Sequence, residues 1–389
     1  MTKWTQAVHA GKGTPWPKSR PTVQPIYQTS VFSFNSLEAV DEAFSGDEGA
    51  FVYSRYGNPG LQVLEQALAQ LEGGEAALVA SSGMASITSA VLSLCGAGDH
   101  IITTQDLYGG TQVLFSREMS RFGIEVSFLD VTQAYRIEEA IKPNTKVLFV
   151  ETISNPLMKV VDLAALVAIK RGYGLYLLVD NTFASPLVCR PLEYGVDLVL
   201  ESLTKYINGH SDVTGGAVVG SKEIIDRIRP LHINMGGVPS PFDCWLVMRG
   251  LKTLPLRMKQ HCSNALLVAE FLATQPGVTH VHYPGLPGHP HYKLAQRQMS
   301  AYGGMLSFVV AGGCYAADKV IRRLKLVEFV PSLAGVATTI SHPAKTSHRG
   351  MTSFDRAKLG IDDGMIRVSV GIEDPEDICA DFEQALRND

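Results

Sequence analysis

The sequence predicts an α/β protein, with a mostly parallel sheet in a large domain and a smaller C-terminal α/β domain after it. Short apolar runs alternate with longer segments in which apolar residues recur at a helical period. Strands that alternate with helices favour a parallel sheet covered by helices on both faces. The chain has 389 residues, 46% of them apolar, which is enough for two hydrophobic cores.

The N-terminal part, residues 1–55, contains Pro and Gly and shows no clear period, so we expect an arm there. Residues 56–247 are expected to form the large domain, because seven apolar runs follow one another in it. In chain order they are AALVA, HIITT, IEVSFLD, TKVLFV, YGLYLLVD, VDLVLES and GAVVG. The segments between them, such as Leu163–Lys170, carry apolar residues at helical spacing.

Residues 248–389 differ in character and are expected to form the second domain. A long helical stretch, Gln260–Gln275, is followed by the turn-rich segment YPGLPGHP. Strand-like runs then appear at Met305–Val310 and Met365–Val370. This mixture of one long helix and short strands fits a small α/β unit.

The charge balance restricts the class of partner. The sequence has 34 Lys and Arg against 38 Asp and Glu, so no broad basic field is available for a nucleic acid or an anionic membrane. The start, MTKWTQAVHAGKG, lacks the apolar segment of a signal peptide, and the most apolar later region is interrupted by Lys170 and Arg171. We therefore expect a cytoplasmic protein that acts on a small molecule.

The cysteines and histidines do not indicate a metal site. The six cysteines are scattered without a CxxC pair, so we expect free thiols. His289 and His291 are the closest approach to a metal-binding pair, and we interpret them as part of a solvated Pro-rich loop.

The segment SLTKYINGHSD places a lysine directly after a buried apolar run. Most lysines are solvated surface charges. Lys205 follows the run Val196–Leu200, where partial burial would disfavour the ammonium form and lower its pKa. A neutral lysine amine is a nucleophile that forms Schiff bases with carbonyl compounds such as pyridoxal phosphate. Ligands bind at the carboxyl ends of parallel strands. If Lys205 holds pyridoxal phosphate, other groups that bind this cofactor should therefore lie at the ends of the other apolar runs.

Three other run ends carry groups that suit the same cofactor. Ser82 and Gly83 open a helical pattern, and a helix start binds phosphate, although simple N-capping by Ser82 is the favoured explanation of these residues taken alone. Asp180 ends the run YGLYLLVD, where it can pair with a protonated pyridine nitrogen or cap the next turn. Tyr108, after HIITT, can stack on an aromatic ring, move a proton or simply pack.

The motifs of two other enzyme classes are absent from the sequence. No G-x-G-x-x-G follows a strand, and no Walker pattern occurs. The segment GHSDV has Val213 where a nucleophile elbow requires its closing glycine. Nucleotide-binding and hydrolase functions therefore lose their main support.

The order of the motifs resembles the trans-sulfuration family of pyridoxal-phosphate enzymes. This family includes cystathionine γ-lyase, cystathionine γ-synthase, cystathionine β-lyase and methionine γ-lyase. The resemblance covers essentially the whole chain, through VYSRYGNP, LEGGEAALVASSGMAS, DLYGG, ETISNP, VDNTFASP, SLTKYINGHSDVTGG and IRVSVGIED. It implies the fold of type I pyridoxal-phosphate enzymes, which is that of aspartate aminotransferase.

The resemblance also implies the role of each site residue. Lys205 would hold pyridoxal 5′-phosphate covalently and shuttle protons, Asp180 would pair with the pyridine nitrogen, and Tyr108 would stack on the ring and act as the acid at the leaving group. The phosphate would be bound by Gly83, Met84, Ser202 and Thr204, together with Tyr53 and Arg55 of a neighbouring subunit. The substrate carboxylate would be bound by Arg367, Asn155 and Ser332. Without the resemblance, Arg367 could be an ordinary surface ion pair. Shared sites imply a dimer, and the full assembly would be a homotetramer.

The resemblance implies γ-elimination from a sulfur amino acid such as cystathionine, homocysteine or methionine, giving 2-oxobutanoate, ammonia and a thiol. The alternatives are γ-replacement, as in cystathionine γ-synthase or an O-acylhomoserine sulfhydrylase, and cystathionine β-cleavage. A fold-type I aminotransferase or decarboxylase, or a cofactor-binding protein without activity, would share only the lysine and aspartate pattern.

Three departures from the family pattern concern the substrate. Many methionine γ-lyases have cysteine where this chain has Gly110, and many cystathionine-handling members have glutamate where it has Pro331. The segment Lys345–Arg349 adds two cations to a motif usually written PAxMTH. We therefore expect a roomy pocket for an uncharged or acidic γ-substituent.

Overall fold

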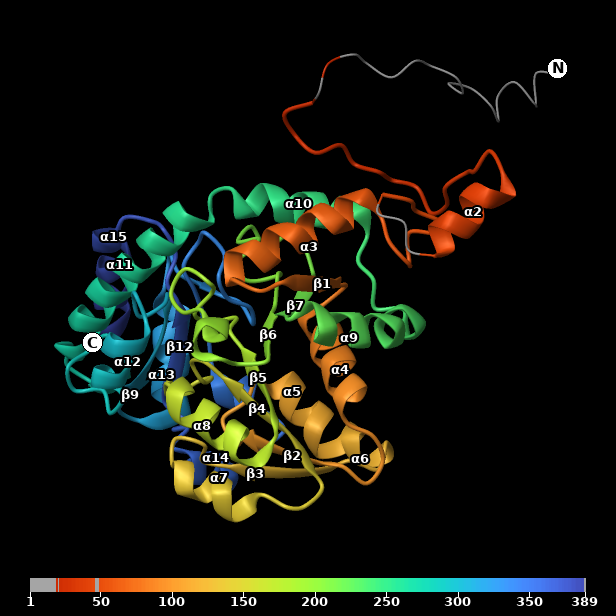
Figure 1. The fold of residues 1–389 in the computed structure, drawn as a ribbon. Coiled ribbons are helices and arrows are strands. Elements are labelled where there is room, and N and C mark those ends of the chain that lie inside the picture. Colours follow the sequence, from red (N-terminus) through yellow and green to blue (C-terminus); the bar gives the residue numbers. More distant parts are fainter. Residues whose placement is uncertain (1–18, 20, 46–48, 388–389) are drawn as a thin grey trace.

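The computed structural model describes residues 19, 21–45 and 49–387, and Figure 1 shows their arrangement. Part of the predicted arm, residues 1–18, 20 and 46–48, lies outside the described residues. The described part of the arm extends away from the body of the molecule and carries one short helix, α2 (Leu37–Phe44) (Figure 1).

The first sheet has seven strands, and each of the seven apolar runs contains one of them, except that the fourth strand extends one residue beyond its run, to Glu151. In chain order they are β1 (Ala76–Ala80), β2 (His100–Thr104), β3 (Glu125–Leu129), β4 (Thr145–Glu151), β5 (Tyr176–Asp180), β6 (Leu198–Glu201) and β7 (Gly216–Gly220). Their order across the sheet is β1-β7-β6-β5-β4-β2-β3. Strands β2 to β6 are parallel, and β7 runs antiparallel to both β1 and β6. The prediction of a mostly parallel sheet is confirmed.

Helices cover both faces of this sheet. On one face Val150, Val179 and Val199 pack in a cluster with Leu64 of α3 and Leu166 of α8. On the other face the alternate strand residues pack against α4 and α9, in a second cluster that includes Phe149, Leu178, Leu200, Ile87 and Ile228. The helices of this region are α3 (Pro59–Glu72), α4 (Gly83–Leu94), α5 (Gly109–Val113), α6 (Met119–Arg121), α7 (Ala134–Ala140), α8 (Leu163–Tyr173), α9 (Lys222–Met235) and α10 (Pro241–Leu251), with a π-helical turn η1 (Leu114–Glu118) and a 3₁₀ turn η2 (Pro191–Tyr194).

The second sheet has five strands in the order β10-β11-β12-β9-β8. These strands are β8 (Val278–His282), β9 (Met305–Val310), β10 (Glu328–Phe329), β11 (Thr339–Ser341) and β12 (Met365–Ser369). The helices of this part are α11 (Leu254–Ala273), α12 (Tyr292–Gln298), α13 (Gly313–Arg323), α14 (Ser353–Leu359) and α15 (Pro375–Leu386), with a 3₁₀ turn η3 (Pro343–Lys345). The long helix α11 connects the two parts of the molecule (Figure 1). The second, smaller α/β unit is therefore present; the division at residues 247 and 248 stays a prediction.

Local sequence fixes the ends of the helices that surround the site. Helix α3 begins after Asn58, whose side chain accepts the N–H of Gly60, with Pro59 in its first position, and it ends at Gly73 with a φ of 77°. Helix α4 is capped by Ser82, whose side chain accepts the N–H of Ala85. These caps let α3 lead into β1 and let α4 begin where β1 ends.

Among the described residues, no helix combines the length and the apolar character needed to cross a membrane.

Candidate active site

Lys205 lies in a series of turns that directly follows β6. Its Nζ donates a hydrogen bond to Oγ of Ser332, at 3.1 Å. Burial, together with the nearby charge of Arg367, lowers the pKa of Lys205 to about 8. The lysine that the sequence singled out is therefore desolvated, and a substantial share of it is neutral amine near pH 8.

Arg367 and Asn155 lie beside Ser332, the hydrogen-bond partner of Lys205. Arg367 lies in β12, only 5% exposed, and donates to Oδ1 of Asn155 at 3.0 Å and to the backbone carbonyl of Ser332 at 3.5 Å. Burial lowers the pKa of Arg367 to about 10. The three residues that the resemblance assigns to the substrate carboxylate thus meet beside the lysine, although they come from three distant parts of the chain.

The phosphate side of the site forms where α4 begins. Ser82 accepts the N–H groups of Ala85 and Ser86, each at 3.1 Å, which leaves the first two N–H groups of the helix, those of Gly83 and Met84, for an anion. Ser202 lies against Gly83, because a Cβ on that glycine would be 3.1 Å from Cβ of Ser202. The helix start and the serine therefore form one surface.

Thr204 is held by Gly215, the residue that directly precedes β7. Its Oγ1 accepts the N–H of Gly215 at 2.9 Å. A Cβ on Gly216 would collide with the carbonyl oxygen of Ser82, so only a glycine lets β7 approach the start of α4 this closely.

Asp180 ends β5 and faces the same edge of the sheet. It accepts the N–H of Thr182 at 3.0 Å as well as a hydrogen bond from the Thr182 side chain, and burial raises the pKa of its carboxyl. Thr182 in turn accepts the N–H of Ser202 at 2.9 Å, which connects the carboxylate to the phosphate side. Sequence reasoning missed Thr182, although it lies two residues after Asp180.

Tyr108 is 49% exposed and stands at the start of α5. A Cβ on Gly110 would be 2.6 Å from the Tyr108 ring and 3.2 Å from the sulfur of Met84. The space that glycine provides here is occupied by the tyrosine ring itself, which lies near the start of α4.

Glu151 is a second residue that sequence reasoning missed. It ends β4 directly beside Asp180 in the sheet register, and its Oε1 accepts the backbone N–H of Tyr108 at 2.6 Å. The backbone N–H of Asn155 also bonds to this carboxyl. Burial and the neighbouring Asp180 raise its pKa well above the ordinary value. The signal was available, because Glu151 ends a buried run just as Asp180 does.

The group of buried carboxyls extends to Glu201, at the end of β6. Burial raises its pKa, as does the charge of Glu72 at the end of α3. Three neighbouring parallel strands thus end in acidic residues: Glu151, Asp180 and Glu201. Glu151 and Asp180 are partners in the sheet register and face the same side, whereas Glu201 follows Leu200, the register partner of Asp180, and points to the opposite face, toward Glu72. The carboxyls of Glu151 and Asp180 therefore favour a cation on their side of the sheet, and an anion fits the start of α4. The residues present fit a cofactor with a basic ring nitrogen at one end and a phosphate at the other.

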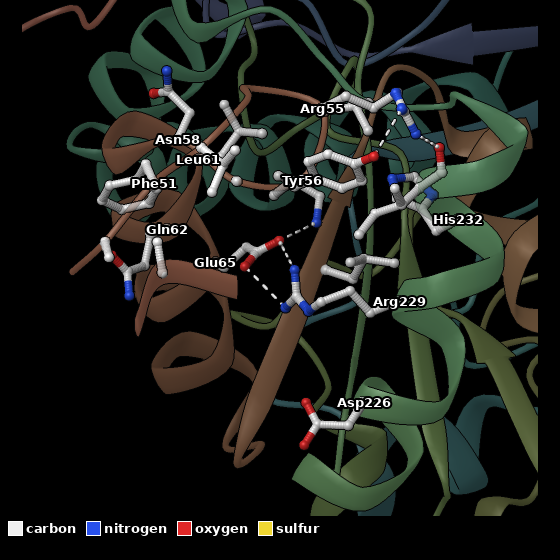
Figure 2. Close-up of a pocket in the computed structure, with 18 of the residues that line it drawn as sticks. Phe51, Arg55, Tyr56, Asn58, Leu61, Gln62, Glu65, Asp226, Arg229 and His232 are labelled. Carbon is white, nitrogen blue, oxygen red and sulfur yellow. Dashed lines mark hydrogen bonds and ion pairs between the residues drawn. The ribbon is translucent and has the colours of Figure 1, made fainter. Parts of the chain in front are cut away.

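Tyr53 and Arg55 do not join this group within one chain. Arg55 donates to the carbonyl of Ile233 at 3.0 Å and lies 4.7 Å from the centre of the Tyr56 ring, and Tyr53 is 40% exposed. Figure 2 shows Arg55 and Tyr56 at a cavity of about 690 Å³ between the arm, α3 and α9, with the Glu65–Arg229 ion pair and His232 in its wall. Lys205 does not line this cavity.

A family model described as "Cys/Met metabolism PLP-dependent enzyme" matches residues 4–387. The chain is 45% identical over 365 residues to an L-methionine gamma-lyase of Porphyromonas gingivalis, covering 93% of this chain and 92% of that one. It is 43% identical to a cystathionine gamma-lyase of Bacillus subtilis, with full coverage of both chains. It is 42% identical to an O-succinylhomoserine sulfhydrylase of Pseudomonas aeruginosa, covering 93% of this chain and 90% of the other.

Among solved structures, the fold is similar to that of metB from Corynebacterium glutamicum. The TM-score is 0.90 at 40% identity, with 98% of this chain and 97% of the other covered.

Proposed function

Because the chain belongs to the Cys/Met metabolism family of PLP-dependent enzymes, we propose that it catalyses γ-elimination from sulfur amino acids. The products would be 2-oxobutanoate, ammonia and a thiol. The observation that carries the proposal is the partly buried Lys205 amine, which donates to Ser332 next to the Arg367 guanidinium. A proton acceptor thus lies beside a group that binds a carboxylate, which is where the Cα–H of an amino acid would be placed.

Pyridoxal 5′-phosphate, when bound, supplies an electrophilic carbonyl and a ring that withdraws electrons from the substrate. Lys205 would hold it, Asp180 would keep its ring nitrogen protonated, and Tyr108 would cover its ring. Its phosphate would be bound by the backbone of Gly83 and Met84 and by the hydroxyls of Ser202 and Thr204.

The chain's own residues then bind the substrate and move its protons. Arg367 binds the α-carboxylate with its two-pronged guanidinium, aided by Asn155 and Ser332. Lys205 removes the proton at Cα, since its lowered pKa makes the neutral amine available near pH 8. Tyr108, half exposed beside the start of α4, donates a proton to the departing sulfur.

γ-Replacement is the second candidate activity. An O-succinylhomoserine sulfhydrylase is 42% identical to this chain, a value close to those of the γ-lyases. The carbonyl of Ser347 lies so close to Gly109 that a Cβ there would collide with it. The segment with Lys345 and Arg349 therefore adjoins the Tyr108 loop, where its cations would favour an acidic γ-substituent.

A substrate panel decides between these activities. The purified holoenzyme is incubated with cystathionine, homocysteine, methionine and O-succinylhomoserine, the last with and without added thiol, and keto acid, ammonia and thiol are measured. We expect 2-oxobutanoate from more than one sulfur amino acid and some replacement product from the ester. Pyruvate as the sole keto acid from cystathionine would contradict γ-elimination, because it marks cleavage at Cβ.

We further propose that the site is completed by a second copy of the chain, in a dimer that forms part of a homotetramer. Arg55 supports this proposal. The hydrogen bonds of its guanidinium within one chain go to uncharged groups, the carbonyl of Ile233 and the hydroxyl of Tyr56, so its charge is available to an anion in a neighbouring subunit. The exposed arm residues Val31, Leu37, Phe44 and Tyr53 also support it, since a partner subunit would cover them.

A further inference from the structure

Arg257 is a buried arginine in the first turn of α11, only 4% exposed. Its guanidinium donates to the backbone carbonyls of Tyr206 at 2.6 Å, Ile207 at 3.2 Å and Gly250 at 2.9 Å. Its Nε donates to the hydroxyl of Thr253 at 3.1 Å. All four acceptors are uncharged.

Burying a guanidinium without a carboxylate is costly, because carbonyl dipoles replace its hydration only in part. Burial alone lowers the pKa of Arg257 to about 10, with no carboxylate contributing to the shift. The carbonyl of Gly250 lies near the carboxyl end of α10, where the helix dipole stabilises a cation. A Leu or Met would fill the same volume at lower cost, so packing does not explain an arginine here.

The carbonyls that Arg257 binds belong to the turn that carries Lys205. Tyr206 and Ile207 follow the lysine directly, and the N–H of Gly209 returns to the carbonyl of Lys205 at 2.7 Å. Gly209 has a φ of 76°, and a Cβ on it would collide with the guanidinium. The turn therefore has both the backbone conformation and the open space that the arginine needs.

Arg257 also belongs to the helix that leads into the second sheet. Lys205 extends from the large sheet, whereas its hydrogen-bond partner Ser332 lies in the part of the chain that contains the second sheet. A rigid connection between the lysine turn and α11 would fix the position of Nζ relative to Ser332 and Arg367.

We propose that Arg257 is a positioning residue for Lys205, holding the carbonyls of the lysine turn against the junction of α10 and α11. The inference rests on the role of Lys205 proposed above. Arg257 itself touches neither substrate nor cofactor in this assignment, so its effect appears in proton transfer and in the mobility of the turn.

The test compares Arg257→Gln, Arg257→Lys and Gly209→Ala with a control, Arg249→Gln, which removes an exposed arginine from the end of α10. Hydrogen exchange is measured on the protein freed of cofactor, in peptides that cover residues 203–210. For the holoenzyme, kcat, KM and the pH midpoint of the visible absorbance are measured. Gly209→Ala keeps the charge of Arg257, but the added methyl group displaces its guanidinium. This variant therefore tests the proposal if Arg257→Gln does not fold.

We expect exchange in the lysine turn to accelerate roughly 10-fold or more in Arg257→Gln and Gly209→Ala, while peptides from the strands keep wild-type rates. The kcat should fall about 10- to 100-fold with KM within about 3-fold, because a displaced base slows proton transfer without weakening carboxylate binding. The pH midpoint should move, and Arg257→Lys should restore part of kcat. The Arg249→Gln control should match wild type.

Wild-type exchange, kcat and pH midpoint in the variants would overturn the proposal, and so would exchange that rises equally in every peptide, which indicates a role in global stability only. The two proposals can fail separately. If the wild type turns over no sulfur amino acid but the variants show faster exchange in the lysine turn and a shifted pH midpoint, the positioning role stands and the proposed function fails.

Discussion

At the scale of single residues, Asp180 is the strand-end carboxylate that we propose pairs with the ring nitrogen of the cofactor. Its carboxyl is held by Thr182, and burial raises its pKa, so it gains from a cationic partner. In Asp180→Asn a neutral amide would replace it. We expect cofactor still to attach, with its visible band retained, while kcat falls about 100-fold or more. The control Asp226→Asn removes a surface carboxylate and should change nothing; near-normal turnover in Asp180→Asn would contradict the assignment.

The lowered pKa of Lys205 predicts a pH effect on stability. Between pH 8 and the ordinary lysine pKa of 10.5, the unfolded chain binds a proton at this residue that the folded chain does not. Stability therefore increases with pH across this window. In Lys205→Met this contribution is absent, so the melting temperature of the cofactor-free wild type should rise relative to that of the variant from pH 8 to 10. A constant difference between the two would show that the lysine is not desolvated. The variant should also lack the visible band of attached cofactor.

Pro331 bears on substrate choice, because its neighbour Ser332 touches the Lys205 amine. Pro331 is exposed and offers no charge to the distal ammonium of cystathionine. In Pro331→Glu we expect kcat/KM to shift toward cystathionine over methionine by about 1 kcal/mol, the scale of one charge-assisted hydrogen bond. Pro331→Gln is the matched control without charge. An equal shift in both variants would assign the effect to the loss of proline.

At the scale of elements, the start of α5 determines where the Tyr108 ring lies. A Cβ at Gly110 would overlap the ring and press on Met84, so Gly110→Ala should displace Tyr108. We expect kcat to fall about 10-fold and the circular dichroism of the bound cofactor to change. The same substitution in a Tyr108→Leu background should have little further effect. Additive losses would show that Gly110 acts elsewhere.

The inner strands of the large sheet could be predicted from sequence because they are buried on both faces and bounded by turn residues, whereas the edge strand β3 is only partly buried. The run HIITT is β2, and GAVVG is β7, residue for residue. The direction of β7 could not be read in this way, since an apolar run has the same pattern in either direction.

The candidate site was predicted from side chains at or just after the ends of strands, as with Asp180 at the end of β5 and Lys205 in the turn after β6, or from motifs that match the family. Arg257 could not be found by either route. Its two acceptors in the lysine turn are backbone carbonyls, which leave no trace in the sequence, and they lie 50 and 51 residues away along the chain. Glu151 carried the same signal as Asp180, an acidic residue at the end of a strand, but its partner, the backbone N–H of Tyr108, cannot be read from the sequence.

At the scale of the whole molecule, the arm predicts a site shared between subunits. Arg55 should act in the site of the partner, so Arg55→Ala and Lys205→Ala, each poorly active alone, should complement each other when refolded together. One of the two sites in a mixed dimer would contain both lesions and the other neither. Random mixing should return about a quarter of wild-type activity. Proven mixed dimers without activity would refute the shared site; arginine and lysine would then act in the same subunit.

The hydrogen bond between Arg367 and Asn155 joins residues that are 212 positions apart. During synthesis at about 5–20 residues per second, roughly 10–40 s separate the emergence of these two residues from the ribosome. The large sheet can form in that interval, but Arg367, to which we assign the substrate carboxylate, is still missing. Such distant contacts close late in folding, because a long loop must be ordered first. With that assignment, a nascent chain that has acquired its large sheet does not yet bind an amino acid, and the synthesis of β12 sets the moment at which it can.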